Sequence, residues 1–363
     1  MSVEISVKSQ SGSYPVFTGT GILEEKLTGW FGETGYNRCF LFVDENVWDH
    51  HQERISTLFN SLNTTYELFI VPPGEQSKSF EMWQKGIDFL MDNGVRRNTP
   101  LITIGGGITG DLSGFVASSA MRGIPLVHIP TTLLAMVDSS IGGKTGINHA
   151  AGKNLVGAFY SPQLVISDLD LLDTLPDREW VNGLSEILKY GAISNSEIFS
   201  LSKLFLEGDF KQIAKTKLAL LVSTCAQIKA EIVQNDEHES GKRAYLNFGH
   251  TFAHAIEKAC NFDVMSHGEA VFLGMLGAIE LSNLTGSSIN REQIYKYRKL
   301  YSFNVQKKDL DPAELTGYMQ HDKKRSGRHL TFILLENWQH PVIKTVTSQG
   351  LIHKAWDKLL QEL

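Results

Sequence analysis

Short apolar runs alternate with helix-length segments along the first half of the chain. Val3, Ile5 and Val7 alternate with polar residues, as in a half-buried strand. Five continuous runs of strand length follow, at Cys39–Val43, Glu67–Val71, Leu101–Ile104, Leu126–Ile129 and Leu164–Ile166. Helix-length segments such as Ser79–Met91 and Asp111–Met121 separate several of them. This alternation predicts a mostly parallel, doubly wound sheet.

The pattern changes after Pro176. Strand-like runs nearly vanish, and helix-compatible stretches follow at Asp177–Tyr190, Lys211–Gln234, Thr251–Ala259 and Glu269–Leu284. One late run, Thr331–Leu335, has the length of a short strand. Because 363 residues suffice for two domains, we predict an α/β domain over residues 1–175 and an all-α domain over residues 176–363. The cleft between two such domains is the natural place for a ligand.

Composition narrows the class of protein. Apolar residues make up 42% and charged residues 20%, which is typical of a globular chain and not of a disordered one. The net charge of −6 argues against nucleic-acid binding but leaves room for a local pocket that binds an anionic substrate. The three cysteines are far apart, so we expect no disulfide framework. Neither a signal peptide nor a membrane-spanning run is evident, so we expect a cytoplasmic protein.

A glycine-rich turn follows the strand that ends at Ile104. Gly105–Gly110 has the G-x-G-x-x-G spacing, which lets backbone N–H groups approach a pyrophosphate, although tight turns share it. No Asp or Glu lies between Leu112 and Val137, where the usual dinucleotide fingerprint has an acid for the ribose. Asp44 ends another strand, so it is either an alternative ribose ligand or a simple turn residue.

Further polar segments follow predicted strands. Pro72–Lys78 and Pro130–Thr132 either face a ligand at the sheet edge or only form turns and helix caps. Lys144, Lys153 and Asn154 lie on glycine-rich backbone, which suits an anionic sugar or phosphate, or else a solvated surface loop. The spacing lacks the GxxxxGK[ST] pattern, so we exclude a nucleoside triphosphatase.

Candidate metal ligands lie in the helical half. His250 and His254 are four residues apart and share a helix face. Thr251 excludes the HExxH pattern of common zinc proteases. Glu186 with two histidines would leave one coordination position of a zinc ion open for substrate, although 12 histidines also offer such sets by chance.

Taken together, these segments resemble the 3-dehydroquinate synthase family. The resemblance runs in order from about residue 70 to residue 275 and is fainter at both ends. It is carried by Gly105–Asp111, Met121–Gly123, Pro130–Lys144, Gly152–Asn154, Thr174–Pro176, Glu186–Gly191, Asn247–Glu257 and His267–Ala270.

The resemblance implies an activity, two cofactors and an assembly. The family converts 3-deoxy-D-arabino-heptulosonate 7-phosphate to 3-dehydroquinate and phosphate, the second step of the shikimate pathway. NAD is reduced and reoxidised within one turnover, and a divalent metal, zinc or cobalt, is required. The substrate's own phosphate is expected to act as the base, so the site mainly binds and orients. A Rossmann-like N-terminal domain, a helical C-terminal domain and a homodimer are also implied.

The resemblance also implies roles for individual residues. The metal ligands would be Glu186, His250 and His267. The residues at NAD positions are Asp44, Gly74, Glu75, Gln76, Lys78, Gly106, Gly107, Gly110, Asp111, Thr131, Thr132, Lys144, Lys153, Thr174 and Leu175. Lys144, Asn154, Asn247, His254 and Lys324 (or its neighbour Lys323) match contacts at or near the substrate phosphate, and Lys229 and Arg243 match contacts to the carboxylate. The remaining site positions are Asp138, Lys153, Lys189 and Glu239, and Arg122 matches an arginine supplied by the partner subunit.

Three alternatives stay open. Other sugar-phosphate cyclases, such as 2-deoxy-scyllo-inosose synthase or an epi-valiolone synthase, use substrates without a carboxylate, and the presence of Arg243 and Asn247 argues against them. An iron-type alcohol or glycerol dehydrogenase would not need so many lysines, because its polyol substrate is neutral. An NAD-binding protein without activity would be expected to lack a metal ligand, whereas all three are present.

Overall fold

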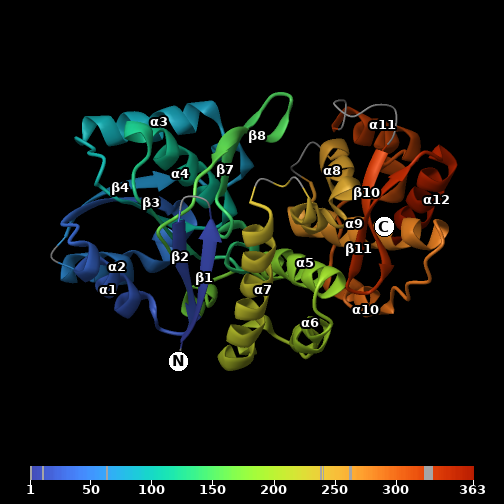
Figure 1. Ribbon diagram of the computed structural model, residues 1–363, viewed down its shortest axis with the longest axis horizontal. Coiled ribbons are helices and arrows are strands. Elements are labelled where there is room, and N and C mark those ends of the chain that lie inside the picture. The colour runs from blue at the N-terminus through green and yellow to red at the C-terminus, as the bar shows by residue number, and fades with distance from the viewer. Residues whose placement is uncertain are drawn as a thin grey trace. The chain divides into compact units, whose positions relative to one another are not determined.

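The computed structural model describes residues 2–9, 12–62, 64–237, 239, 241–260, 264–322 and 330–363 (Figure 1). The chain divides into two compact units. The first comprises Met1–Pro176 and Ala214–His238, and the second comprises Asp177–Ile213 and Glu239–Leu363.

A seven-stranded sheet forms the centre of the first unit. Its strand order is β1-β2-β9-β6-β5-β3-β4, and only the pairing of β1 with β2 is antiparallel. This confirms the prediction of a mostly parallel sheet. The strands span Ser2–Ser9 (β1), Gly12–Gly19 (β2), Arg38–Asp44 (β3), Thr65–Val71 (β4), Leu101–Gly105 (β5), Leu126–Pro130 (β6) and Leu164–Asp168 (β9).

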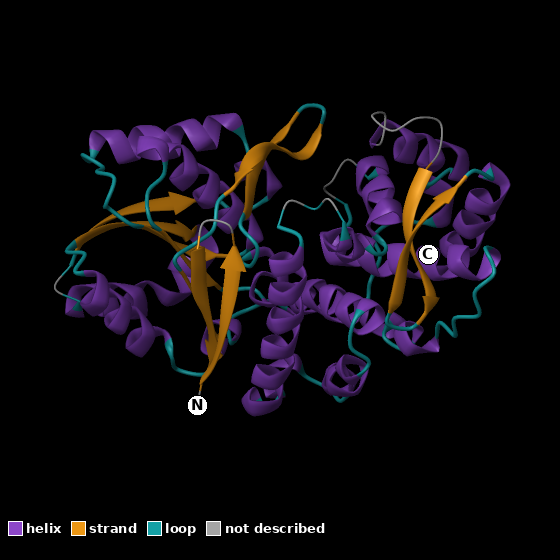
Figure 2. Ribbon diagram, viewed as in Figure 1, coloured by secondary structure: helices purple, strands orange, loops and turns teal. Residues whose placement is uncertain are grey.

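Helices cover both faces of this sheet. Successive strand residues point to opposite faces, so Leu41 and Val43 pack under one helical layer and Phe40 and Phe42 under the other. Both faces are buried, which explains the continuous apolar runs in the sequence. The first layer contains α1 (Leu23–Thr34) and α2 (Glu45–Ser61), and the second contains α3 (Phe80–Asp92) and α4 (Gly107–Ser119) (Figure 2).

Two elements of the first unit differ from the sequence analysis. The lysine- and glycine-rich segment is an antiparallel hairpin of β7 (Lys144–His149) and β8 (Gly152–Phe159), not a loop. Helix α7 (Lys215–Asn235) belongs to the first unit, although the predicted boundary assigned it to the second. Its small side chains Ala226 and Ala230 are buried against the β1–β2 hairpin, which accounts for its place there.

The second unit is mostly helical, as predicted. It contains α5 (Asp177–Ile193), α6 (Glu197–Leu201), α8 (His250–Ala259), α9 (His267–Leu284), α10 (Glu292–Tyr295), α11 (Pro312–Asp322) and α12 (Gln349–Leu359). Helix α9 is buried on all sides from Gly268 to Ser282, and its composition is accordingly apolar all round. Among the helices in the described ranges, none is long and apolar enough to cross a membrane.

A two-stranded hairpin corrects the expectation of an all-α domain. Strands β10 (Leu330–Asn337) and β11 (His340–Val346) pair antiparallel where we expected one short strand. Gln339 in the connecting turn donates its backbone N–H to Ala192 O at 2.8 Å and its side-chain amide to Gly191 O at 2.6 Å. The turn therefore satisfies carbonyl groups at the end of α5, which the helix itself leaves without partners.

Candidate active site

The strand order places a crevice at the carboxyl edge of the sheet. Strand β3 leads through α2 to β4 on one side, whereas β5 leads through α4 to β6 on the other. Ligands of open parallel sheets bind where such a reversal occurs. Asp44 ends β3 and Gly105 ends β5, and these two strands are neighbours. The two motifs that the sequence suggested for NAD therefore lie side by side at the reversal.

Asp44 connects this strand end to the glycine-rich turn. Its Oδ1 caps α2 by accepting the N–H of Asn46 at 3.0 Å, and its Oδ2 accepts the hydroxyl of Thr109 at 3.4 Å. Burial raises the pKa of Asp44, and the hydrogen bonds from the start of α2 oppose that change. The structure thus gives this carboxylate a local capping role in addition to its proposed contact with ribose.

The glycine-rich turn leaves no room for side chains. A Cβ at Gly105 would lie 2.7 Å from Thr109, and a Cβ at Gly106 or Gly107 would lie 3.0 Å from Thr132 or Ser139. Helix α4 begins at Gly107, and the first N–H groups of a helix lack intrahelical partners. A small pocket lined in part by Gly105, Gly106 and Gly110 adjoins this helix start. The turn therefore fits a pyrophosphate group.

A polar cluster lies beside the turn. Lys78 is buried, and its Nζ lies 2.7 Å from Asp111 Oδ2 and in hydrogen-bond contact with Asn154. Burial raises the pKa of Asp111, and the nearby charge of Lys78 opposes that change. Asn148 donates to Glu75 Oε1 at 2.8 Å and accepts the N–H of Asn154 at 2.9 Å. Four residues singled out from the sequence thus meet through Asn148, which the sequence analysis missed.

Helix α7 contributes one of the candidate substrate residues to the first unit. Lys229 Nζ lies 2.9 Å from Asp138 Oδ1 and donates to the Asp138 carbonyl at 2.7 Å. Asp138 lies in a single π-helical turn, Ala135–Ser139. The structure therefore pairs two residues that are 91 positions apart in the sequence.

The other predicted residues of the first unit do not all lie at this edge, because Arg122 follows the end of α4 and precedes β6, at the opposite edge of the sheet. Gly74 has φ +100°, and a Cβ there would meet Gln76 at 2.5 Å. Thr174 lies 2.9 Å from His51, beyond the end of β9. Thr131 and Leu175 are buried, Thr132 and Lys153 are partly buried, and Lys144, Asn154 and Arg122 are exposed.

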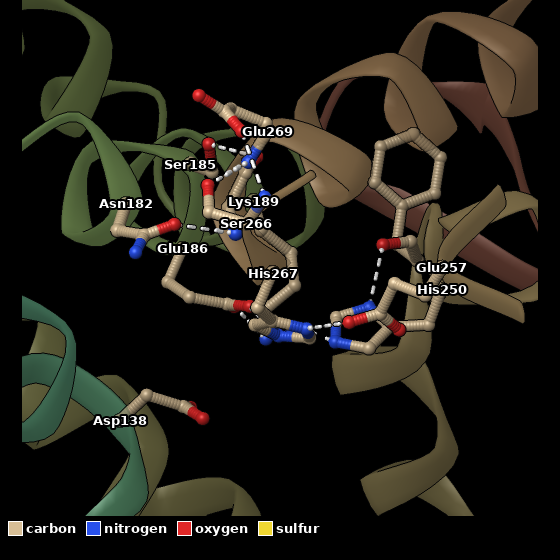
Figure 3. A network of polar contacts seen from close by, with 12 residues as sticks. Asp138, Asn182, Ser185, Glu186, Lys189, His250, Glu257, Ser266, His267 and Glu269 are labelled. Atoms are coloured by element: carbon tan, nitrogen blue, oxygen red, sulfur yellow. Dashed lines mark hydrogen bonds and ion pairs between the residues drawn. The ribbon is translucent and has the colours of Figure 1, made fainter. Parts of the chain in front are cut away.

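The three candidate metal ligands converge in the second unit. Glu186 lies within α5, and His250 and His267 are the first residues of α8 and α9. One ligand atom of each lies within 4.8 Å of the others. Glu186 Oε1 is 3.6 Å from His250 Nε2 and 3.3 Å from His267 Nε2 (Figure 3).

The second ring nitrogen of each histidine has its own partner. His250 Nδ1 lies 3.2 Å from Phe248 O, and His267 Nδ1 lies 3.3 Å from the buried Glu257 Oε1. An acceptor at Nδ1 favours the tautomer whose Nε2 carries a lone pair, and metal-binding histidines are usually held in this way. Two imidazoles and one carboxylate form a donor set suited to zinc or cobalt. The residues therefore fit a divalent metal.

Electrostatics distinguish the two histidines. The pKa of His250 is lowered to about 3, chiefly by burial and in part by the charge of nearby Lys189, although the Glu186 carboxylate opposes this change. Burial alone would also lower the pKa of His267, but hydrogen bonds to Glu186 and Glu257 outweigh it and raise this pKa to about 10. Lys189 contacts Glu186 directly from one turn along α5. Burial thus favours the neutral form of His250, whereas the two neighbouring carboxylates favour the charged form of His267.

Other predicted residues of the second unit lie around these ligands in the sequence and the fold. Arg243 is buried in the helical turn Lys242–Asn247, and Asn247 donates to Glu239. The His254 ring lies 5.6 Å from that of His250. Lys323 and Lys324 lie outside the described residues. Glu257, which orients His267, was missed as a site residue, although its position seven residues after His250 could have indicated the same helix face.

Comparison with known proteins supports one family over most of the chain. The family model for the 3-dehydroquinate synthase N-terminal domain matches residues 68–182, and that for the C-terminal domain matches residues 183–325. A 3-dehydroquinate synthase of Nitrosospira multiformis is 40% identical over 341 residues, covering 92% of this chain and 91% of the relative. One of Neisseria gonorrhoeae is 37% identical and covers 97% of this chain and 98% of its own.

Solved structures with the same fold belong to related enzymes. A 2-deoxy-scyllo-inosose synthase complexed with carbaglucose-6-phosphate, NAD⁺ and Co²⁺ is 24% identical, with a TM-score of 0.83 over 99% of this chain and 100% of that one. A 2-epi-5-epi-valiolone synthase of Streptomyces hygroscopicus with NAD⁺ and Zn²⁺ bound is 26% identical, with a TM-score of 0.82 over 89% and 91%. An iron-containing alcohol dehydrogenase is 14% identical, with a TM-score of 0.66 over 96% and 97%. The resemblance found in the sequence is therefore confirmed: this chain is an enzyme of the 3-dehydroquinate synthase family.

Proposed function

We propose that the protein converts 3-deoxy-D-arabino-heptulosonate 7-phosphate to 3-dehydroquinate and phosphate. It would act as a carbon–oxygen lyase that uses NAD and a divalent metal, zinc or cobalt. The main observation behind this proposal is that Glu186, His250 and His267, in a chain of this family, each place a ligand atom within 4.8 Å of the others. The relatives at about 40% identity support the substrate.

The second unit would hold the metal. Glu186 would supply a carboxylate oxygen, and His250 and His267 would supply Nε2. When bound, a divalent metal would polarise the hydroxyl on the substrate carbon that gives up a hydride, since such an ion stabilises developing negative charge on oxygen. Phe248 O and Glu257 keep the two imidazoles turned toward Glu186. Three protein ligands leave a position open for the substrate.

The first unit would bind NAD. The backbone of Gly106 and Gly107 would contact the pyrophosphate at the start of α4, and Asp44 would accept ribose hydroxyls. NAD would supply the hydride-transfer chemistry when bound, so the protein's task is to bind and orient. Two of the similar solved structures contain bound NAD⁺, which supports this assignment.

Each unit contains polar side chains that match the family's contacts to an anionic substrate. In the first unit, Lys144, Lys153 and Asn154 lie on the β7–β8 hairpin, and Lys229 projects from α7 beside Asp138. In the second unit, Arg243 would bind the carboxylate through a bidentate contact, which a guanidinium favours. The substrate's own phosphate would act as the base. We also propose a homodimer in which Arg122 reaches the partner's substrate.

The second candidate is a cyclase whose substrate lacks a carboxylate. The fold shared with 2-deoxy-scyllo-inosose synthase favours it. Arg243 argues against it, because this residue matches the family's contact to the substrate carboxylate, and a guanidinium binds a carboxylate through two parallel hydrogen bonds. Arg243→Gln should therefore raise KM for the heptulosonate phosphate about tenfold or more, as expected for a lost charged hydrogen bond.

A phosphate-release assay tests the proposal. The metal-loaded protein is incubated with catalytic NAD and the heptulosonate phosphate, while free phosphate and NADH absorbance are followed. Phosphate release over many turnovers without net NADH would support the proposed reaction. Turnover of glucose 6-phosphate or sedoheptulose 7-phosphate instead would support the second candidate, and net NADH from glycerol would support a dehydrogenase.

A further inference from the structure

Side chains of helix α5 form hydrogen bonds with both backbone polar groups of Gly268, the residue next to the proposed ligand His267. Gly268 directly follows His267 at the start of α9. Its N–H donates to Asn182 Oδ1 at 2.7 Å, and its carbonyl accepts the hydroxyl of Ser185 at 2.6 Å. Ser185 in turn directly precedes Glu186. These hydrogen bonds therefore connect the immediate neighbours of two proposed metal ligands.

The contact depends on the absence of a side chain at position 268. A Cβ there would lie 2.5 Å from both the Cα and the carbonyl oxygen of Asn182. The two helices thus approach more closely than any other residue would permit. Asn182 and Ser185 are three positions apart, so they lie on the same face of α5 and can engage both sides of Gly268.

A tyrosine extends this chain of hydrogen bonds. Tyr301 Oη lies 2.7 Å from Ser185 Oγ, and both side chains are buried. The Tyr301 ring stacks on Phe272, one turn along α9 from Gly268, with ring centroids 3.9 Å apart. The hydroxyl is therefore held in place by an aromatic contact with the same helix that carries His267.

The direction of the hydrogen bonds among Tyr301, Ser185 and Gly268 follows from how many protons each group can donate. A serine hydroxyl has one proton, and a carbonyl oxygen can only accept. The closest carbonyl to Ser185 Oγ is that of Gly268 at 2.6 Å, whereas that of Val181 is 3.5 Å away. Ser185 therefore donates to Gly268, and Tyr301 donates to Ser185.

We propose that Asn182, Ser185 and Tyr301 form a clamp that sets the position of His267 relative to Glu186 and thereby tunes metal affinity. This inference rests on the metal centre proposed above. His267 begins a helix, and helix ends fray unless they are held. The clamp fixes the backbone from which the His267 ring projects, so its three members are positioning residues. Substituting groups that orient metal ligands typically costs about 10- to 100-fold in affinity.

The order of donors predicts a ranking of variants. Ser185→Ala removes the hydrogen bond to Gly268 and leaves the buried Tyr301 hydroxyl without its acceptor. Tyr301→Phe removes one hydrogen bond but keeps the one between Ser185 and Gly268. We therefore expect Ser185→Ala to weaken metal binding by about tenfold and Tyr301→Phe to weaken it less. The double variant should resemble Ser185→Ala, because the two groups act in series.

The same unit contains a matched control. Ser202 Oγ lies 2.7 Å from Tyr297 Oη, both side chains are buried, and both hydroxyls lie near the carbonyl of Phe199. No residue of this second pair adjoins a proposed ligand. Ser202→Ala and Tyr297→Phe should lower the melting temperature about as much as the clamp variants while leaving metal affinity unchanged.

The experiment measures metal affinity directly. Each metal-free variant is titrated with Zn²⁺ or Co²⁺ against a chromophoric chelator, and the visible spectrum of the Co²⁺ form reports the ligand geometry. The clamp is supported if Ser185→Ala weakens binding and changes the spectrum while Ser202→Ala does neither. It is overturned if Ser185→Ala binds as the wild type does, or if both serine variants lose affinity equally.

A further variant distinguishes failure of the proposed metal centre from failure of the clamp alone. His250→Ala removes a proposed ligand without touching the clamp. If the wild type bound neither ion, or if His250→Ala bound both as tightly as the wild type, the proposed metal centre would fall, and the clamp with it. Loss of binding in His250→Ala combined with wild-type affinity in Ser185→Ala would reject the clamp alone.

Discussion

A single residue at the glycine-rich edge can have more than one role, although the sequence indicates only one of them. Asp44 was selected as a possible ribose ligand, and the structure adds its capping of α2 and its contact with Thr109. The metal set could be selected because residue type, helical spacing and family resemblance agreed. Asn182 and Ser185 could not be selected from the sequence, because they form hydrogen bonds with the backbone of Gly268, which lies more than 80 positions away. Hydrogen bonds over such distances leave no local pattern in a sequence.

At the same scale, His128 should make stability depend on pH. It is buried in β6, and a Cβ at Gly110 would lie 3.5 Å from its ring. Burial lowers its pKa to about 4, so the unfolded chain takes up the proton at a higher pH than the folded protein does. This contribution is fully present above about pH 6.5 and is lost as pH falls toward about 4.

The variant His128→Gln isolates this effect. Between about pH 7.5 and pH 5, the wild type should lose about 2 kcal/mol more of its free energy of unfolding than the variant does. Urea denaturation at the two pH values measures this difference. Equal losses in the two proteins would show that His128 titrates normally.

At the scale of elements, the ends of parallel strands are joined to helices by buried carboxylates. Asp168 ends β9 and is fully buried. It accepts the N–H groups of Gly21 at 2.9 Å and Leu23 at 3.1 Å, where α1 begins, and its Oδ2 lies 2.9 Å from Arg54 of α2. One side chain thus ties a strand to two helices of the same layer.

Asp168→Ala should therefore be strongly destabilising. It leaves the guanidinium of Arg54 and three backbone N–H groups, those of Gly21, Leu23 and Asp170, without this acceptor, so we expect a loss of about 3–5 kcal/mol in the free energy of unfolding. Urea denaturation at neutral pH measures it. Glu81→Ala is the control, because Glu81 and Lys85 form an exposed pair at 2.7 Å, and such surface pairs contribute little to stability. A comparable loss in both variants would contradict the role given to Asp168.

Over the whole molecule, the sequence predicted the features that depend on apolar patterning, such as the parallel sheet. It missed features that depend on which elements pair with each other. The parallel sheet followed from apolar runs such as Leu101–Ile104, because burial on both faces requires them. Strand β8 was missed because its glycines and exposed residues resemble a loop. The place of α7 was missed because Ala226 and Ala230 fit either helix packing or sheet packing. An apolar pattern indicates that a segment is buried, but it does not indicate which element of the structure covers it.

The proposed homodimer makes a prediction that only an assembly can satisfy. Arg122 is exposed in a turn where Met121, Arg122 and Gly123 all have positive φ, at 51°, 65° and 113°. Non-glycine residues rarely adopt this conformation, and it is often retained at functional sites. If Arg122 serves the partner's substrate, Arg122→Ala should raise KM for the heptulosonate phosphate strongly while leaving NAD affinity near that of the wild type, which isothermal titration can check.

Mixing two impaired variants, at a substrate concentration far below the KM of Arg122→Ala, tests whether Arg122 acts across the interface. In a heterodimer of Arg122→Ala and His250→Ala subunits, the site of the first subunit keeps its own His250 and receives Arg122 from the second. The other site lacks both groups. Random reassortment of equal amounts makes half of the dimers mixed, so activity should recover to about a quarter of the wild-type value. If Arg122 instead served its own subunit, every site in the mixture would lack one group, and activity would stay at the level of the separate variants.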